Sequence, residues 1–266
     1  MTERKYTIDR LSASRVKTYQ TCPKQYEYDY LTDIEVPEEE EVEHFMVGNS
    51  IHDTAEEFLL NHDVNQSKED IEDILVEIES GMDYNYDDRN KVENCLSFLA
   101  KFISGYVDSV NTVEEKMTMT QSGIDFVGYA DLIGEVEGVN TVVDWKTGKE
   151  NPEWKEKIQG GMYVKMFHEM YGEWPESIQF VYLDEGTRSV HSRISDGEVM
   201  WNSQQNKYWD EINGYISNMT NSAFTGEFEA KPDSSKCYWC DFKFACSDYI
   251  GGKGSEPQHY EIEGVI

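Results

Sequence analysis

The 266-residue sequence predicts an α/β protein in which a central mixed β-sheet is flanked by helices. Three β-rich runs follow one another, and the last of them begins a strand-helix-strand connection. Helical periodicity precedes this core and returns after it. We expect one domain over residues 1–266, with a helical part at 11–110, an αβ core at 111–195 and a C-terminal helix with a cysteine-rich segment at 196–266.

The residues before the sheet predict helices. Leu11 to Leu31 starts with cap-like serines, carries apolar residues at helical spacing and breaks near its proline. After an acidic segment, an amphipathic helix is expected to begin at Asn49 or Ser50, which places His52 in its first turn. Residues 67–108 have a helical pattern and are strongly acidic, so we expect them to pack over the core as helices.

The predicted core is a meander followed by a crossover. The runs EKMTMT, DFVGYADLIGEV and NTVVDWKTG are β-rich and are separated by glycine-containing turns. The run IQFVYLD predicts the strand after the helix, and a further strand is expected near Arg188 to Ile194. Because a strand-helix-strand connection is right-handed and returns the chain to one sheet, these strands should form a single sheet.

The crossover helix is marked at both ends. Asn151 and Pro152 supply an N-cap and a first helical residue, and Gly172 follows the last turn. The apolar face of this helix is expected to consist of four residues: Trp154, Ile158, Met162 and Met166.

The composition restricts the function classes. With 23 Lys and Arg against 53 Asp and Glu, the net charge of -30 argues against a general nucleic-acid coat protein. An acidic exterior can still surround a narrow basic cleft in which divalent cations neutralise carboxylates. The sequence has no apolar run of about 18 residues and no signal peptide. We therefore expect a cytoplasmic protein without a membrane partner, in the host cell cytoplasm if the source is viral.

Two carboxylates and a lysine form the most informative group. Asp131 and Asp144 fall on consecutive strands joined by a short turn, and Lys146 points to the same strand face as Asp144 because it lies two residues beyond it. The alternative is that Asp131, Asp144 and Lys146 are ordinary polar residues on the solvent-exposed face of a hairpin. However, these residues end an apolar β-run, where a buried charge is costly unless it is paired or binds a metal. Hydrolysis of a phosphodiester needs such acids, with a cation beside them.

These residues resemble the motif of the PD-(D/E)xK nucleases. Asp131 matches the first acid, Asp144 the second acid and Lys146 the catalytic lysine, while Ala130 stands where the motif has proline. The resemblance implies a restriction-endonuclease-like core, closed by a clasp of N- and C-terminal cysteines.

Further residues resemble the RecB C-terminal and Cas4-like branch of that superfamily. His52 matches the helix-borne histidine that is an additional metal ligand. Gln159 and Tyr163 match a Gln-x-x-x-Tyr motif, whose amide and phenol can reach a DNA strand or hold the lysine. Residues four apart share one helix face. Glu115 resembles the glutamate on the strand before the first acid, with Glu114 as the competing choice.

The cysteines predict a second inorganic site. Cys237, Cys240 and Cys246 lie in one short segment, a pattern typical of a metal or cluster site. Cys22 resembles the distant N-terminal cysteine that completes a 4Fe-4S cluster in Cas4-like nucleases. Zinc stays open, because the spacing alone does not separate the two. Cys95 is left over and is interpreted as a small core residue.

The resemblance implies Mg2+- or Mn2+-dependent cleavage of DNA, as an exonuclease on single-stranded ends. His52, Asp131 and Asp144 would hold the metal and Lys146 would assist the attacking water. Two alternatives stay open: a catalytically quiet iron–sulfur adaptor for a helicase, recombinase or integrase, and a zinc-stabilised protein without nucleic-acid function. The tyrosines of the N-terminal helices could stack on unpaired bases, although packing is the simpler interpretation: Tyr19, Tyr26, Tyr28 and Tyr30.

Overall fold

The computed structural model describes residues 5–36, 43–84, 86–150, 153–192 and 200–251. The chain forms two compact units. One comprises Glu39–Trp209 and contains the β-sheet, so we call it the sheet unit. The other joins Met1–Glu38 with Asp210–Ile266, and we call it the end unit. Among the described residues, no helix combines the length and apolarity needed to cross a membrane.

The sheet of the sheet unit is mixed, as the sequence predicts. Its strands follow the order β2-β3-β4-β5-β6, and only the β4–β5 pair is parallel. The parallel pair results from the crossover through helix α6 (Glu153–Tyr171), as expected for a strand-helix-strand connection. The strands are β2 (Val107–Gln121), β3 (Ile124–Val136), β4 (Val139–Lys146), β5 (Ser177–Tyr182) and β6 (Thr187–Ser192).

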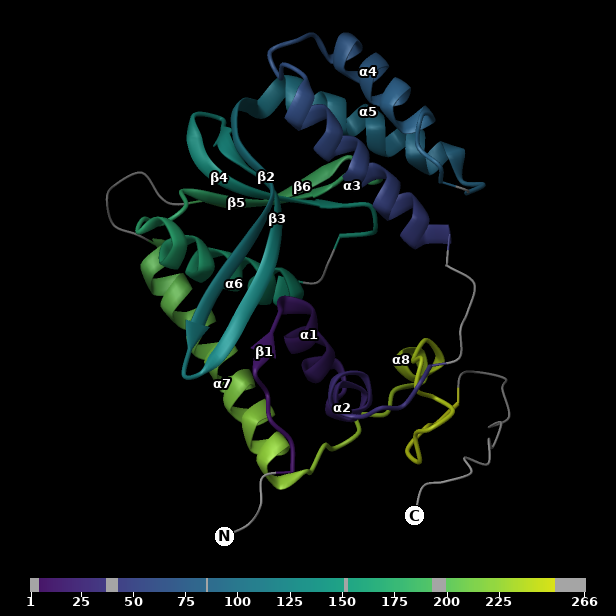
Figure 1. Cartoon of the computed structure of the whole chain (residues 1–266), viewed down its shortest axis with the longest axis vertical. Helices are drawn as coiled ribbons and strands as arrows, with labels where there is room; N and C mark the ends of the chain where they lie inside the picture. Colours follow the sequence, from purple (N-terminus) through teal and green to yellow (C-terminus); the bar gives the residue numbers. More distant parts are fainter. Residues whose placement is uncertain (1–4, 37–42, 85, 151–152, 193–199, 252–266) are drawn as a thin grey trace. The chain divides into compact units, whose positions relative to one another are not determined.

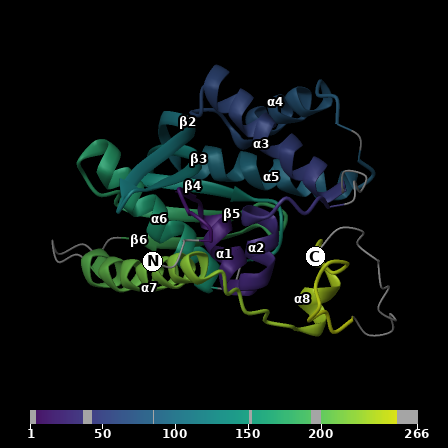
Figure 2. The same cartoon turned by 60° about the horizontal axis from the view of Figure 1, so that its bottom comes forward.

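Helices cover both faces of this sheet. Figures 1 and 2 show α3, α4 and α5 on one face and α6 on the other. On the three-helix side the core includes Phe102 and Trp145, whose rings meet edge to face at 5.4 Å. Burying each such side chain contributes about 2 kcal/mol. The helices are α3 (Glu43–Asn61), α4 (Lys68–Ser80), α5 (Arg89–Tyr106) and α6 (Glu153–Tyr171).

Helix α3 begins earlier than predicted. It starts at Glu43, so the N-cap assigned to Asn49 or Ser50 is wrong, and His52 lies in the body of the helix. The apolar face extends upstream because Val47 is buried, and Ser50 is itself buried, with its hydroxyl 3.2 Å from that of Tyr86. Packing against the core therefore overrides the capping preference of the serine.

The apolar face of helix α6 was predicted correctly at three of four residues. Ile158, Met162 and Met166 are buried as expected, but Trp154 is 39% exposed and does not belong to the apolar face. The N-cap predicted at Asn151 and Pro152 lies outside the described residues.

The end unit brings together the two ends of the chain. Cys22 is extended and separates α1 from α2, which starts at Pro23 as predicted. Tyr26 is fully buried and stacks on Phe228, while the Tyr19 hydroxyl lies 3.0 Å from that of Ser222. Packing is therefore the role of these two tyrosines. The elements here are β1 (Arg10–Leu11), α1 (Ala13–Thr21), α2 (Pro23–Leu31) and α8 (Ser234–Tyr238), with most of α7 (Met200–Thr225).

Candidate active site

The two predicted carboxylates lie where strands β3 and β4 stop pairing. The last pair of the ladder is Leu132 with Val143, so Asp131 and Asp144 follow it on opposite strands. Beyond this point the backbone N–H of Trp145 has no strand partner on β3 and donates to Asp131 Oδ2 instead. The side chain of Asp131 thus replaces a ladder hydrogen bond, which explains how a buried carboxylate is tolerated at this position.

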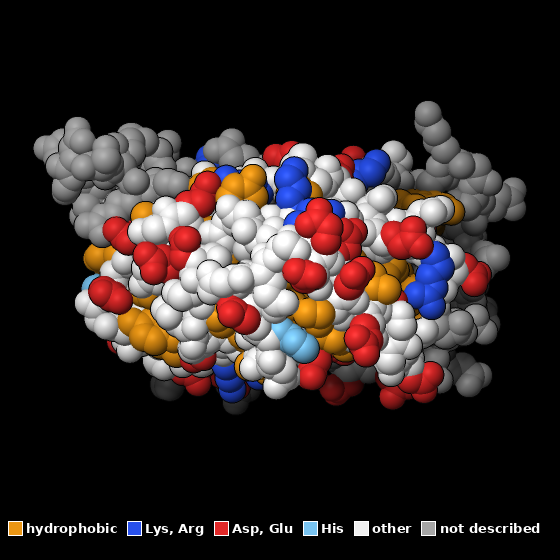
Figure 3. Space-filling model, turned by 90° about the horizontal axis from the view of Figure 1, so that it is seen from above, with side chains coloured by type: hydrophobic (Ala, Val, Ile, Leu, Met, Phe, Trp, Pro, Cys, Tyr) orange, Lys and Arg blue, Asp and Glu red, His pale blue; other side chains and the backbone are white. Residues whose placement is uncertain are grey.

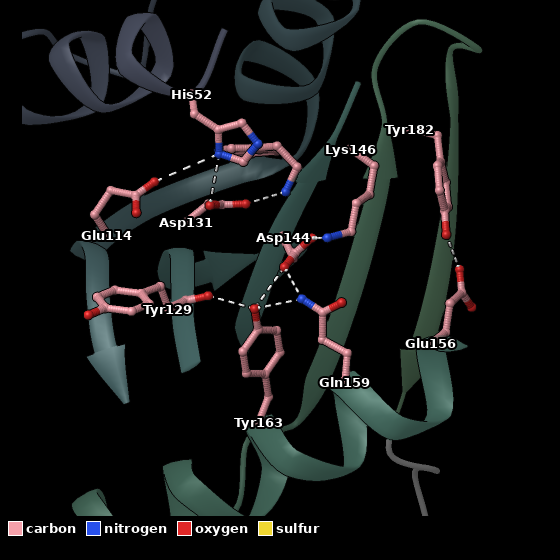
Figure 4. A network of polar contacts seen from close by, with 11 residues as sticks. His52, Glu114, Tyr129, Asp131, Asp144, Lys146, Glu156, Gln159, Tyr163 and Tyr182 are labelled. Atoms are coloured by element: carbon pink, nitrogen blue, oxygen red, sulfur yellow. Dashed lines mark hydrogen bonds and ion pairs between the residues drawn. The ribbon is translucent and has the colours of Figure 1, made fainter. Parts of the chain in front are cut away.

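Helix α6 holds Asp144 from the other side. Asp144 Oδ1 lies 2.6 Å from Gln159 Nε2 and 2.7 Å from the Tyr163 hydroxyl. The same hydroxyl lies 2.6 Å from the carbonyl oxygen of Tyr129, so its one proton serves either acceptor. Figure 4 shows Gln159 and Tyr163 reaching the carboxylate from one face of α6, as their spacing predicts. In the structure both side chains hydrogen-bond to Asp144, which matches the second acid of the motif.

Lys146 completes the group on strand β4. Its ammonium forms an ion pair with Asp144 Oδ2, as expected for residues two apart on one strand face. Burial alone would lower the pKa of Lys146, but the charge of Asp144 and its hydrogen bond outweigh burial and raise the pKa. Lys146 is therefore a charged donor fixed beside the carboxylate.

A second group contains His52, Glu114 and Asp131. His52 Nδ1 lies 3.1 Å from Asp131 Oδ1 and 3.9 Å from Glu114 Oε1. One ligand atom from each of the three residues can be chosen so that all lie within 4.8 Å of one another. Helix α3 contributes the imidazole, while adjacent strands contribute the carboxylates (Figure 4). Two carboxylates and an imidazole suit a divalent cation.

A family model of the PD-(D/E)XK nuclease superfamily matches residues 10–247. The chain belongs to this superfamily. Among solved structures, a candidate exonuclease from Eubacterium rectale is 13% identical, with 84% of each chain covered and a TM-score of 0.48. The protein SSO0001 is 12% identical, with 92% of this chain and 89% of that chain covered and a TM-score of 0.41. No curated protein matches the chain.

Within this superfamily member, Glu114 rather than Glu115 joins the candidate metal group. Val113 pairs with Leu132 and Glu115 with Ala130, which puts Glu114 opposite Asp131. Opposite residues of an antiparallel pair share a sheet face, and the next residue points away. Glu115 instead contributes negative charge near Tyr171. Glu114 also has a φ of 48°, a conformation that a non-glycine residue adopts at a cost of about 1–3 kcal/mol.

The ligand set thus differs from the one expected. His52 and Asp131 are in the candidate metal group as predicted, but Asp144 is not among its three residues. Asp144 is nevertheless close enough for its charge to act on Asp131. Burial and then the charge of Asp144 raise the pKa of Asp131 to about 6, against the opposing effect of His52. A divalent cation would relieve this repulsion between two carboxylates.

The electrostatics of His52 reflect the same concentration of acids. Burial would lower its pKa, but the hydrogen bond to Asp131 and the nearby carboxylate of Glu114 outweigh burial and raise the pKa to about 10. Since a metal ligand must be the neutral imidazole, a bound cation would compete with this proton. Two carboxylates and an imidazole whose ligand atoms lie this close together fit a divalent metal ion, which the nucleases of this superfamily use.

One further buried acid escaped the sequence analysis. Glu156, on α6 and 5% exposed, accepts hydrogen bonds from Tyr182 and Ser189, and lies 3.1 Å from His191 Nε2. These contacts join α6 to β5 and β6 one turn before Gln159 (Figure 4). The position had no motif to mark it, because a single glutamate in a helix resembles any solvated surface residue.

The end unit contains the four predicted cluster ligands. The backbone N–H of Lys231 lies 3.4 Å from Cys22 Sγ, and that of Asp233 lies 3.4 Å from Cys237 Sγ. Burial raises the pKa of the Cys240 thiol to about 11, and the charges of Cys22 and Cys246 act in the same direction. Cys240 therefore lies within electrostatic reach of Cys22 and Cys246, and Cys246 lies within reach of Cys22 and Cys237. Backbone N–H groups face two of the four sulfur atoms.

Cys95 is separate from these four. It lies on α5 of the sheet unit and is fully buried, and burial raises its pKa to about 12. This agrees with the interpretation as a core residue.

Proposed function

We propose that the chain is a DNA nuclease that depends on Mg2+ or Mn2+ and degrades single-stranded ends. One observation carries the proposal: the Lys146–Asp144 pair lies beside the group of His52, Glu114 and Asp131, where strands β3 and β4 separate. The matching family model supports nuclease chemistry. The preference for single-stranded ends rests on the resemblance of His52, Gln159 and Tyr163 to the RecB and Cas4-like branch.

Each residue has a chemical role in this proposal. His52, Glu114 and Asp131 would hold the metal, with Asp144 as a further carboxylate beside them. A divalent ion at this position supplies a Lewis acid and lowers the pKa of water. Gln159 and Tyr163 hydrogen-bond to Oδ1 of Asp144 and thereby fix the orientation of the carboxylate. Its other oxygen, Oδ2, then holds the ammonium of Lys146 in an ion pair. The ammonium of Lys146 can then orient the attacking water and offset charge that develops on the phosphate.

We also propose a 4Fe-4S cluster on Cys22, Cys237, Cys240 and Cys246. Four thiolates can hold zinc or an iron–sulfur cluster, so the preference for the cluster rests on the resemblance of Cys22 to the N-terminal cysteine of Cas4-like nucleases. Visible absorption with iron analysis of anaerobically purified protein tests this, and stoichiometric zinc without iron would contradict it.

The nuclease proposal is tested with end-labelled single- and double-stranded DNA. Wild-type protein should release label with Mg2+ or Mn2+, more readily from single strands, and should release none in EDTA. Asp144→Asn and Lys146→Ala should each lose cleavage. Asp125→Asn is a matched control, because Asp125 is an exposed acid of the same strand as Asp131 and bonds only locally, to Thr120 at 2.7 Å.

The adaptor function is the alternative outcome of this test. DNA binding by all four proteins, with no cleavage by any of them, would favour a quiet module that docks a helicase, recombinase or integrase. Equal cleavage by the wild type and by Asp144→Asn would instead place the activity outside this site.

A further inference from the structure

An exposed aromatic pair lies between the cysteines of the end unit. Trp239 is 79% exposed and Tyr238 is 49% exposed, and their rings meet edge to face at 4.9 Å. By contrast, Trp145 and Trp209 of the sheet unit are 1% and 7% exposed. Tryptophan is usually mostly buried, so an indole this open indicates a contact with something outside the fold.

The backbone around Trp239 is not loose. The N–H of Cys240 lies 3.3 Å from the carbonyl oxygen of Cys237, so the turn that carries Trp239 is closed by a hydrogen bond. Phe242, three residues later, is 3% exposed, and its ring lies 5.8 Å from that of Tyr28. The segment therefore buries Phe242 as its anchor and presents Trp239 on a fixed turn.

The charge near this pair differs from that of the rest of the chain. Residues 231–243 contain three Lys and two Asp, and residues 13–31 contain three Lys or Arg and two Asp or Glu. The other 234 residues contain 17 basic and 49 acidic side chains. Figure 3 shows acidic side chains spread over the face of the molecule that carries α4 and α5. A polyanion would therefore meet less repulsion at the cysteine segment.

We propose that Trp239, supported by Tyr238, is a stacking platform for a base of an unpaired DNA strand, with Lys236 and Lys243 beside its phosphates. Both lysines are exposed and lie within four residues of Trp239. Every base offers a π-face, so such stacking tolerates any sequence, and neighbouring cations add the release of counterions. In a duplex the bases already stack on one another, so this contact selects single strands. The inference rests on the proposed nuclease function and deepens it.

Nucleic acid fits this surface better than a protein partner. Exposed polar residues flank the aromatic pair along the chain, whereas a tryptophan at the centre of a protein interface is surrounded by apolar contacts that exclude water. The exposed polar neighbours are Asp233, Ser234, Ser235, Lys236, Asp241 and Lys243.

The test measures equilibrium binding of fluorescent oligothymidylate by anisotropy, with EDTA present so that no cleavage occurs. Trp239→Ala should bind the oligomer at least about 10-fold more weakly than wild type. Phe224→Ala is the matched control, since Phe224 is a 45% exposed aromatic residue of the same unit, and it should bind as wild type does. Lys236→Gln should reduce the slope of log affinity against log salt by about 0.7.

An abasic oligomer of the same length and charge separates stacking from other effects. Wild type should lose about as much affinity for the abasic oligomer as Trp239→Ala loses for oligothymidylate, and Trp239→Ala should not distinguish the two oligomers. Equal affinity of wild type for both oligomers would overturn the proposal, whatever the stability of the variant. Binding by Trp239→Ala that equals wild type would overturn it as well, and would leave a protein partner as the occupant.

These outcomes are separable from failure of the nuclease proposal. If no cleavage is found in any metal but Trp239→Ala still loses binding to oligothymidylate, the proposed function fails and the platform stands. If cleavage depends on Asp144 and Lys146 but Trp239→Ala has an unchanged KM and affinity, the function stands and the platform fails.

Discussion

The sheet unit and the end unit are stabilised in different ways. The sheet unit surrounds its strands with buried apolar residues on the side of α3, α4 and α5, and its polar groups lie where two strands separate. The end unit combines most of the long helix α7 with three short helices, a smaller set of buried residues and four half-buried thiols. A small core usually needs a metal or a cross-link to be stable. The difference teaches that the two proposed ions would have separate tasks: the divalent metal would serve chemistry in the sheet unit, and the cluster would serve folding in the end unit.

The largest expected effect separates chemistry from folding. Asp144→Asn removes the charge that holds Lys146, so cleavage should fall by about 100-fold or more, as for loss of a positioned charged group. Thermal unfolding and the iron content should stay close to those of wild type. A variant that loses both cleavage and iron would show that the two units do not fail independently.

The converse variant is Cys240→Ser. On the cluster proposal, removal of one thiolate should destabilise the end unit by about 4 kcal/mol or more, because the cluster would contribute to folding. Limited proteolysis should cut the end unit and spare residues of the sheet unit, which should still bind Mn2+. Cys95→Ala is the control: its thiol lies in the sheet unit, so iron should be retained.

A smaller effect tests the register of β2 against β3. Glu114→Gln should weaken Mn2+ binding by roughly 10-fold, the lower end of the range for disturbing a metal site. Glu115→Gln should change it by less than about twofold, because that side chain points to the other face. Isothermal titration with Mn2+ measures both, and the reverse order would restore Glu115 as the ligand.

The smallest effect concerns Tyr163→Phe. The loss of the hydroxyl removes a donor to Asp144 and to the Tyr129 carbonyl, while Gln159 still holds Asp144. Unfolding free energy should fall by about 1–3 kcal/mol, and cleavage should fall by only a few fold at saturating DNA. A loss as large as that of Asp144→Asn would show that the phenol takes part directly in the reaction.

The sequence predicted the elements that depend on local patterns. Strands β3 and β4, the crossover and the position of Lys146 beside Asp144 all follow from periodicity and turns. Only the second half of β2 was predicted, because the strand starts at Val107, where the pattern favoured helix up to residue 108. The choice of Glu114 did not, because register depends on pairing across strands, and β2 shifts register twice before that position. The start of α3 was missed for a similar reason: Ser50 favours a cap locally, but burial of Val47 decides in the fold.

The division into two units was also beyond a reading along the chain. Cys22 and Cys237 were linked through a resemblance, yet nothing in the spacing of the N-terminal residues shows that they leave the helical part and pack with α7 and α8. The exposure of Trp154 could not be predicted for a related reason. Helical spacing shows which residues share one face of a helix, but not how far along the helix that face is buried by the rest of the protein.

The meeting of the two chain ends has a consequence for biosynthesis. Asp131 and Tyr163 are 32 positions apart, whereas Cys22 and Cys246 are 224 positions apart. On a ribosome, every residue of the sheet unit up to Trp209 is made before Cys237. Domains generally fold as they emerge, and distant contacts form last. Cys22 would therefore wait as a single thiol until the segment from Cys237 to Cys246 has been made. The proposed cluster could assemble only from that moment, so supply of iron and sulfide then would limit how much of the end unit folds.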